Sequence, residues 1–365
     1  MNKLKVIQLL PELNIGGVER GTKDFSSALV QRGHESIVIS NGGIFEHDIV
    51  KDGARHIKIP IHKKSLFSLL LSKKLRTVYE EEKPDIVHVR SRMPAWINFY
   101  AFKRLIKKPI LISTFHGLYS TPVYSKVMSK VDHMIAISNT VKEYIKNTYN
   151  VSNDKISVIP RGCDMDHFNK DQVDNDWINE WFREFPQTKN KIILTLPTRI
   201  SKWKGVDNFI ELISRLDGNV FHGLIVGPTS NSKLRYLNSL KKKISELGIN
   251  KSITFTGSRN DISNIYKISD IVFNLSIDPE PFGRTTIEAI SCGAKFIGWD
   301  HGGTKEILEE LFPNGLVPLG NINALEEKVI KVSDKNYLTP KENVFTSERM
   351  INETINLYHQ LLNTE

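Results

Sequence analysis

Short apolar runs alternate with helix-like segments along most of the chain, and this alternation limits its possible folds more than any other feature. Strands are predicted in the first half at residues 6–10, 36–40, 85–89, 110–114, 133–137 and 156–159. In the second half they are predicted at residues 191–197, 221–226, 252–256, 270–275 and 295–298. Helical segments such as 18–32 and 140–148 separate several of them. The pattern predicts an α/β protein whose parallel sheets are wrapped by helices.

The chain length of 365 residues favours two domains of about 170 residues each over a single core. The alternation weakens across the polar residues 164–190, which are the best linker in the sequence. We therefore predict two doubly wound, Rossmann-like domains at 1–170 and 191–346, joined by a linker at 171–190. The final helix, within 347–365, is compatible with either domain.

The net charge of +9 is unevenly distributed. Residues 1–170 contain 27 Lys and Arg against 16 Asp and Glu, whereas residues 171–365 contain 23 against 25. A basic first half predicts attraction to anionic lipid or glycan, although a merely solvated basic face fits equally well. No basic motif interleaved with aromatic residues supports a nucleic-acid partner.

Composition and local patterns place the chain among soluble cytoplasmic proteins. No apolar run approaches the roughly 20 residues of a membrane span. The N-terminus is predicted to be a first strand rather than a signal peptide. Cys163 and Cys292 lack metal-ligand spacing and are predicted to be reduced thiols.

The stretch DPEPFGRTTIEAISCG at 278–293 carries the strongest chemical signal. It follows a predicted strand and begins a helix, and such a junction is a natural phosphate site. Glu280 in the loop and Glu288 in the helix are placed to accept hydrogen bonds from sugar hydroxyls. A capping or dipole-complementing role for either glutamate is the competing interpretation.

Polar residues follow other predicted strands, where ligands of doubly wound sheets bind. Gly16 and Gly17 precede a helix and allow close approach of a ligand, although paired glycines also occur in ordinary loops. His116 lies at another strand end, where a structural role is the commoner one. Arg199 and Lys204 share one loop and form a pair able to clamp a diphosphate, although surface cations are common. Together these residues predict a cleft around a diphosphate-linked sugar.

These motifs, taken in order, make the chain resemble the retaining glycosyltransferases of family 4, which have the two-domain GT-B fold. The resemblance covers nearly the whole chain and looks closest to bacterial members that build lipopolysaccharide or other lipid-linked glycans. The matching segments are GGVER at 16–20, STFHG at 113–117, AISNTVKEYI at 136–145, VIPRGCDMDHF at 158–168, LPTRISKWKG at 196–205, LIVG at 224–227, FTGSRNDI at 255–262, PEPFGRTTIEAISCG at 279–293 and GGTKEIL at 302–308.

The resemblance implies two domains facing one another across a cleft, with the closing helix packing back on the N-terminal domain. It also implies roles for matching positions. The implied catalytic residues are His116, Arg199, Lys204 and Glu280. The implied donor-binding residues are Gly16, Gly17, Gly257, Ser258, Arg259, Phe282, Gly283, Arg284, Thr285 and Glu288. Among the donor-binding residues, Glu288 would hold the ribose hydroxyls, and the region around 257–259 would contact the base.

The implied reaction transfers a hexose-type sugar from a nucleotide sugar, such as a GDP- or UDP-sugar, to a glycan or lipid-linked acceptor. Protein cations would stabilise the leaving diphosphate, so neither a metal nor a cofactor is expected. Asp164 and Asp166 superficially resemble a metal-binding pair but fall in a loop motif of the family. The basic N-terminal domain would contact an anionic membrane peripherally, at the inner face of the cytoplasmic membrane.

Three arginines depart from the family pattern or add charge near the expected acceptor. Arg161 stands where many relatives have Asn, and Arg90 and Arg92 follow the third predicted strand. They favour an acceptor with phosphate or acidic sugar. A nucleotide-sugar epimerase and a non-catalytic nucleotide-sugar-binding protein remain alternative interpretations.

Overall fold

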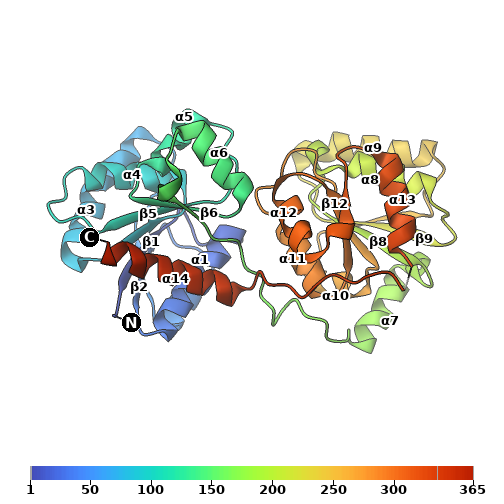
Figure 1. The fold of residues 1–365 in the computed structure, drawn as a ribbon, viewed down its shortest axis with the longest axis horizontal. Helices are drawn as coiled ribbons and strands as arrows, with labels where there is room; N and C mark the ends of the chain where they lie inside the picture. Colours follow the sequence, from blue (N-terminus) through green and yellow to red (C-terminus); the bar gives the residue numbers. More distant parts are fainter. Residues whose placement is uncertain (1, 335, 365) are drawn as a thin grey trace. The chain divides into compact units, whose positions relative to one another are not determined.

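A computed structural model describes residues 2–334 and 336–364, and the chain divides into two compact units (Figure 1). Unit 1 comprises Met1–Pro160 and Glu348–Glu365, and unit 2 comprises Arg161–Ser347. Among the described residues, no helix is both long and apolar enough to span a bilayer.

Unit 1 is built on a seven-stranded parallel sheet with the order β3-β2-β1-β4-β5-β6-β7. The strands are β1 (Lys5–Leu9), β2 (Glu35–Ser40), β3 (Arg55–Lys58), β4 (Ile86–Val89), β5 (Ile110–Phe115), β6 (His133–Ala136) and β7 (Ile156–Val158). The helices are α1 (Gly17–Gln31), α2 (Glu46–Lys51), α3 (Leu71–Glu82), α4 (Arg92–Phe102), α5 (Pro122–Ser125), α6 (Asn139–Tyr149) and α14 (Ser347–Asn363). Central strands such as β4 and β5 are buried throughout, as expected when helices cover both faces.

Helix α14 packs on unit 1, although it is the last helix of the chain (Figure 1). Its residues Ile355 and Tyr358 share a hydrophobic core with Val6 and Phe25. The Tyr358 hydroxyl also lies 2.5 Å from Nδ1 of His88 on β4. A buried aromatic side chain with a bonded hydroxyl anchors a helix by both apolar contact and geometry.

Unit 2 is built on a six-stranded parallel sheet with the order β10-β9-β8-β11-β12-β13. The strands are β8 (Ile192–Pro197), β9 (Phe221–Val226), β10 (Ile253–Gly257), β11 (Ile271–Asn274), β12 (Lys295–Trp299) and β13 (Leu316–Val317). The helices are α7 (Asn175–Glu184), α8 (Val206–Arg215), α9 (Leu234–Glu246), α10 (Ile262–Ile268), α11 (Arg284–Ser291), α12 (Gly302–Leu311) and α13 (Ile322–Val332). The predicted α/β class and two doubly wound sheets are thereby confirmed.

The segment 171–190, predicted as a linker, instead contains helix α7 and belongs to unit 2. Trp181 is buried in a cluster with Phe185 and Ile193, and its Nε1 donates to Thr188 Oγ1 at 3.1 Å. Trp177 stacks on Trp181 with 5.3 Å between ring centroids. The linker prediction missed this helix because most of its residues are polar, although its aromatic face packs on the sheet.

Candidate active site

In each sheet the strand order reverses at one place, and polar residues singled out from the sequence follow the strands there. The reversal lies between β8 and β11 in unit 2, and between β1 and β4 in unit 1. Ligands of doubly wound sheets bind outside the carboxyl ends of the strands at this switch point. Arg199 and Lys204 follow β8, and Glu280 follows β11. Gly16 and Gly17 follow β1.

A cavity of about 210 Å³ occupies the switch point of unit 2. It is lined from β8, β11 and the start of α11 by Leu196, Pro197, Thr198, Arg199, Lys204, Phe273, Asn274, Ser276 and Thr285. Both cations predicted to hold a diphosphate therefore line the same cavity as Thr285. The cavity combines two positive side chains with small hydroxyl and amide groups, a lining suited to an anionic ligand.

Glu280 is held by two donors at the edge of this cavity. Lys204 Nζ forms an ion pair with Glu280 Oε1, and Ser276 Oγ donates to the same oxygen at 2.7 Å. The side chains of Lys204 and Glu280 are only 17 % and 13 % exposed. Lys204 also lies 4.0 Å from the centre of the Trp203 ring. The cation and the carboxylate are thus fixed relative to one another before a ligand arrives.

Two glycines allow the loops around the cavity to pack closely. Gly205 follows Lys204 with φ +70°, and a Cβ there would overlap the carbonyl oxygen of Leu275. A Cβ at Gly303 would lie 2.5 Å from Cα of Phe282. The Gly303 amide donates to the Glu280 carbonyl at 2.7 Å, which fixes the backbone at Glu280. Close backbone contact without side chains therefore shapes this site.

Helix α11 begins directly after this loop, with Gly283 at the cap position in the left-handed region at φ +98°. No side chain caps the helix, and the first amides of a helix have no partner within it. The Phe282 side chain is buried and packs against Phe345, which leaves its backbone as the part able to meet a ligand. The geometry therefore offers backbone amides and a helix dipole to an anion near Thr285.

Glu288 lies in the second turn of α11 and is buried. Arg284 Nη2 donates to Glu288 Oε1 at 2.8 Å, one helical turn apart. The ion pair offsets part of the cost of burying the carboxylate. The structure thus joins these two predicted donor-binding residues in one ion pair.

Arg259, predicted to help bind the base, is occupied by structural contacts. Its guanidinium donates to both carboxylate oxygens of Asp261 at 2.9 and 2.7 Å and to Glu184 at 3.0 Å. The hydrogen bonds that Arg259 donates to Asp261 hold the pKa of Arg259 above its usual value. The side chain therefore ties α7 to the start of α10. The base site around 257–259 stays a prediction.

In unit 1, Gly16 is the cap residue of α1 and Gly17 is its first residue. Neither a capping side chain nor a strained φ is present at Gly16, whose φ of −176° is ordinary extended backbone. His116 follows β5 directly and is half-buried. All three residues lie at the carboxyl edge of the sheet in unit 1, as predicted from the sequence.

Arg90, predicted to add charge near the acceptor, is buried in unit 1. Its side chain is 6 % exposed, Nε donates to Gln8 Oε1 at 2.8 Å, and the guanidinium lies 5.3 Å from the centre of the Phe25 ring. Burial lowers its pKa to about 10. Arg90 is therefore held within the core of unit 1, and its assignment to the acceptor side stays a prediction.

Arg92, two residues further on, lines an open cavity of about 740 Å³. Its Nη1 donates to Thr121 Oγ1 at 2.9 Å, and its guanidinium lies 4.8 Å from the centre of the Tyr119 ring. Lys64 is the other cation of the cavity, whereas Arg161 does not line it. The remaining lining residues are Ser65, Leu69, Met93, Trp96, Tyr100, Ser120, Thr121 and Tyr124.

The aromatic wall of this cavity was missed from the sequence. Trp96 stacks on Tyr100 and on Tyr124, each with 6.4 Å between ring centroids. The spacing of Trp96 and Tyr100 by four residues along α4 was an available signal. Tyr124 comes from α5 and reaches this wall only through the fold.

Among the described residues, no cluster of three or more His, Cys, Asp and Glu side chains is arranged to hold a metal ion. Asp164 instead accepts from the amides of Asp166 and His167 at 3.2 and 3.3 Å. The aspartates of this segment thus form a turn.

Comparison with known proteins gives two family matches and several relatives. Residues 15–167 match Glycosyltransferase Family 4, and residues 178–352 match Glycosyl transferases group 1. A solved glycosyltransferase from Rickettsia africae ESF-5 is 30 % identical, with TM-score 0.84 and full coverage of both chains. The N-acetyl-alpha-D-glucosaminyl L-malate synthase of Bacillus anthracis is 24 % identical over 99 % of this chain and 98 % of its own.

A further relative from Escherichia coli is named UDP-Gal:alpha-D-GlcNAc-diphosphoundecaprenol alpha-1,3-galactosyltransferase. It is 26 % identical over 98 % of this chain and 97 % of its own length. The matches run through both units.

Proposed function

The chain belongs to the family 4 glycosyltransferases, and on that premise we propose a retaining hexosyltransferase of cell-envelope, lipopolysaccharide-type glycan synthesis. Its donor is a nucleotide sugar bound by unit 2, and its acceptor is a lipid-linked glycan bound by unit 1. The cavity that combines Arg199, Lys204 and the start of α11 carries the proposal. The name of the Escherichia coli relative, with its UDP-sugar donor and diphospholipid acceptor, supports the choice of substrate classes.

Charge stabilisation on the donor side is the main catalytic contribution. Breaking the bond between the anomeric carbon and the phosphate oxygen leaves negative charge on the nucleoside diphosphate. We assign the stabilisation of this charge to Arg199, Lys204 and the amides at the start of α11, because both cations and Thr285 line one cavity. Preorganised donors of this kind often provide the largest part of a rate enhancement. Protein groups thus do the work for which a metal is used elsewhere.

The two glutamates bind hydroxyls rather than transfer protons. Glu280 would accept from hydroxyls of the transferred sugar, and its contacts with Lys204 and Ser276 fix its orientation. Glu288 would accept hydrogen bonds from the ribose hydroxyls while it keeps its ion pair with Arg284. Both glutamates lie on the donor side, unlike the flanking pair of a glycosidase.

Transfer with retention places the new bond on the face that the phosphate leaves. The acceptor oxygen bonds to the anomeric carbon, the bond from that carbon to the phosphate oxygen breaks, and the acceptor proton passes to the leaving phosphate. His116 would contact the sugar near the reacting carbon, and Gly16 and Gly17 would allow close approach to the phosphates.

The aromatic cavity of unit 1 suits the proposed acceptor. Trp96, Tyr100 and Tyr124 offer flat apolar faces to a sugar ring, and Arg92 and Lys64 offer charge to its phosphate. Since a lipid-linked acceptor resides in a membrane, the enzyme would work peripherally at the inner face of the cytoplasmic membrane.

The proposal is tested by incubating the purified enzyme with UDP- and GDP-hexoses and a short-chain diphospholipid-linked sugar. NMR of the product should show the anomeric configuration of the donor. Glu280→Ala should abolish transfer, whereas Asp278→Ala, an exposed carboxylate of the same loop, should leave it unchanged.

Other outcomes would separate the alternatives. Isomerised donor in the absence of acceptor would indicate an epimerase. Inverted product would refute retention. A protein that binds the donor but transfers sugar to none of the acceptors tested would favour a binding protein. Unchanged donor binding in Glu280→Ala would support the same alternative.

A further inference from the structure

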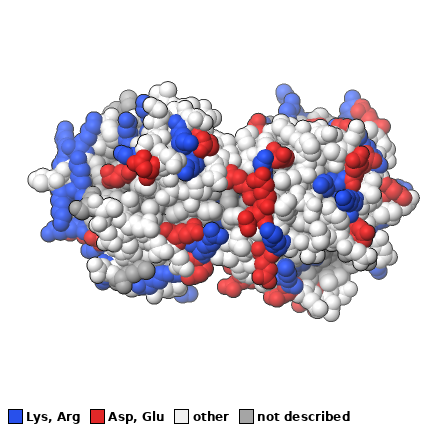
Figure 2. All heavy atoms as spheres, viewed as in Figure 1, with Lys and Arg blue, Asp and Glu red and all other residues white. Residues whose placement is uncertain are grey.

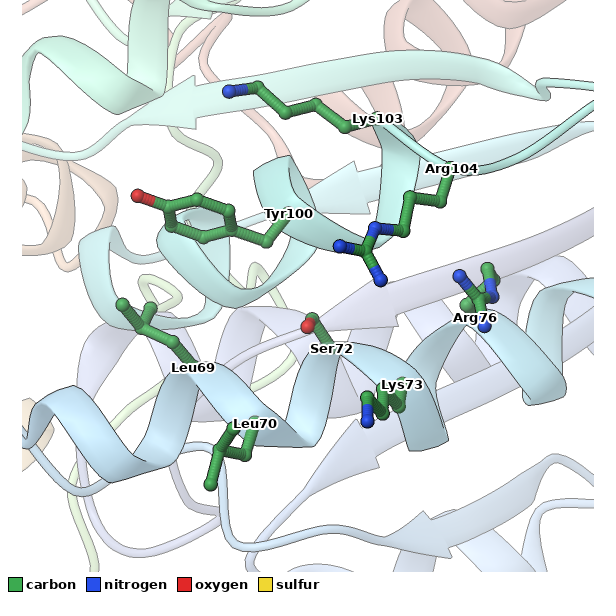
Figure 3. A pocket seen from close by; sticks show the side chains of 8 residues that line it. All are labelled: Leu69, Leu70, Ser72, Lys73, Arg76, Tyr100, Lys103 and Arg104. Carbon is green, nitrogen blue, oxygen red and sulfur yellow. The ribbon is translucent and has the colours of Figure 1, made fainter.

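Unit 1 carries a second cavity beside the aromatic one, and its charged lining residues are all cations. This α3/α4 groove has a volume of about 400 Å³ and runs between α3 and the end of α4 (Figure 3). Lys73 and Arg76 belong to α3, and Lys103 and Arg104 follow α4. Figure 3 shows the Arg104 guanidinium directed toward Ser72 of α3. The groove therefore presents guanidinium, ammonium and hydroxyl donors, which suit a phosphate group.

Charge is retained in the groove because little of it is neutralised. The ion pair of Arg76 with Glu80 at 3.5 Å is the one acidic contact recorded for these four cations in the described part of the chain. Lys103 instead lies over the rings of Phe99 and Tyr100, at 4.6 and 5.5 Å from their centres. In the sequence, 61–78 and 103–108 contain no Asp or Glu. The result is a strongly positive flank, visible over α3 at the left of Figure 2.

Apolar side chains project from the same segments into solvent. Phe67 is 83 % exposed and Leu70 is 66 % exposed, in the turn leading into α3. Ile106 is fully exposed between the cationic pairs 103–104 and 107–108. Exposed large apolar residues among clustered cations are characteristic of surfaces that lie on anionic bilayers. A site for a free anion would need the cations but not these apolar residues.

We propose that the α3/α4 groove binds the phosphate of an anionic lipid headgroup, while Phe67, Leu70 and Ile106 insert at the bilayer surface. The groove and the aromatic cavity share Leu69 and Tyr100. Docking would therefore place the aromatic cavity next to the headgroups, where the diphosphate of a lipid-linked acceptor lies. The inference rests on the proposed function for that acceptor, but membrane binding itself does not require the transfer reaction.

The experiment is sedimentation of the full-length enzyme with vesicles of phosphatidylcholine alone or with phosphatidylglycerol. The wild-type enzyme should bind the mixed vesicles at least about tenfold more tightly. Arg76→Glu/Arg104→Glu should remove about tenfold or more of this preference, and Phe67→Ser/Leu70→Ser should weaken binding to the same vesicles. Lys241→Glu/Lys242→Glu, which makes the same charge change on exposed residues of α9, should bind as wild type.

Thermal unfolding followed by far-UV circular dichroism shows whether each variant is folded. An equal affinity for both vesicle types would overturn the proposal, as would an equal loss in the α9 control. Wild-type vesicle binding by the groove variant would also overturn it. Strong competition by 10 mM inorganic phosphate without any vesicle preference would instead assign the groove to a free anion. Transfer to a water-soluble acceptor analogue tests the proposed function separately, since it needs no vesicle.

Discussion

Unit 1 and unit 2 have the same doubly wound architecture but carry charge in different ways. Unit 1 contains 26 Lys and Arg against 17 Asp and Glu, and unit 2 contains 24 of each, so the whole net charge of +9 lies in unit 1. In unit 2, the site residues Lys204 and Glu280 neutralise one another beside a small cavity. In unit 1, a larger aromatic cavity adjoins the cationic groove.

The difference shows that one sheet topology supports two kinds of recognition. Unit 2 fixes a few charged groups by ion pairs and close glycine packing, which suits stabilisation of charge at a defined point. Unit 1 offers broad aromatic and cationic surface, which suits a large amphipathic acceptor. Variants in each unit should therefore affect different measurements.

The largest effect is expected from Lys204→Ala in unit 2. Removing a cation from the developing diphosphate charge should lower kcat by about 10²–10³. Lys202→Ala is the matched control, because Lys202 lies in the same turn and is exposed. Steady-state kinetics at saturating donor measures both. An equal fall in kcat in the two variants would mean that the conformation of this turn, and not the charge of Lys204, supports the reaction.

Acid should destabilise unit 2 through His222. Burial lowers the pKa of this histidine to about 4, with a further contribution from Lys191. Between pH 6.5 and 4 the unfolded chain takes up a proton that the native unit does not, so stability falls as pH falls through this window. A shift of about 2.5 units corresponds to about 3 kcal/mol. Urea unfolding followed by tryptophan fluorescence reports mainly on unit 2, which holds Trp177, Trp181, Trp203 and Trp299.

The His222→Gln variant should lose most of this acid dependence, whereas His47→Gln should keep it. His47 is an exposed histidine of unit 1. If the free energy of unfolding falls by the same amount in both variants and the wild type between pH 6.5 and 4, acid destabilises the protein through groups other than His222.

A smaller effect is expected from Tyr358→Phe in unit 1. The change removes the buried contact between the Tyr358 hydroxyl and His88 Nδ1, which lie 2.5 Å apart, at a cost of about 1 kcal/mol. Hydrogen exchange with mass spectrometry should show faster exchange in peptides of unit 1 and none of this change in unit 2. Tyr337→Phe in unit 2 is the control. Unchanged protection of α14 would show that apolar packing alone holds the helix.

The smallest effect is expected at the aromatic cavity. Trp96→Ala should raise the acceptor KM about tenfold, or about 1.4 kcal/mol, while the donor KM and kcat stay near wild type. Trp96→Phe should recover much of the loss, because a flat ring remains. A change in donor KM instead would place this cavity in donor binding.

Much of the fold was predictable because strand and helix signals are local. All the predicted strands are present within a few residues, and those missed are the edge strand β3, RHIK, and the two-residue β13. Both missed strands lack a long apolar run, which is the signal that sequence patterns detect best. Helix α7 was also missed, because its polar residues outnumber the aromatic residues that pack it against the core of unit 2.

For the site, the sequence itself determined that cations and carboxylates follow predicted strands, because that depends only on residue order and periodicity. The spatial order of those strands is a tertiary property. It decided that Arg199 and Lys204 line one cavity with Thr285, since β8 and β11 are neighbours only in the folded sheet. It also decided that Arg90 is buried and Arg92 is not. Two residues of spacing carry no information about which face of an element will be covered, because that depends on distant segments such as α1.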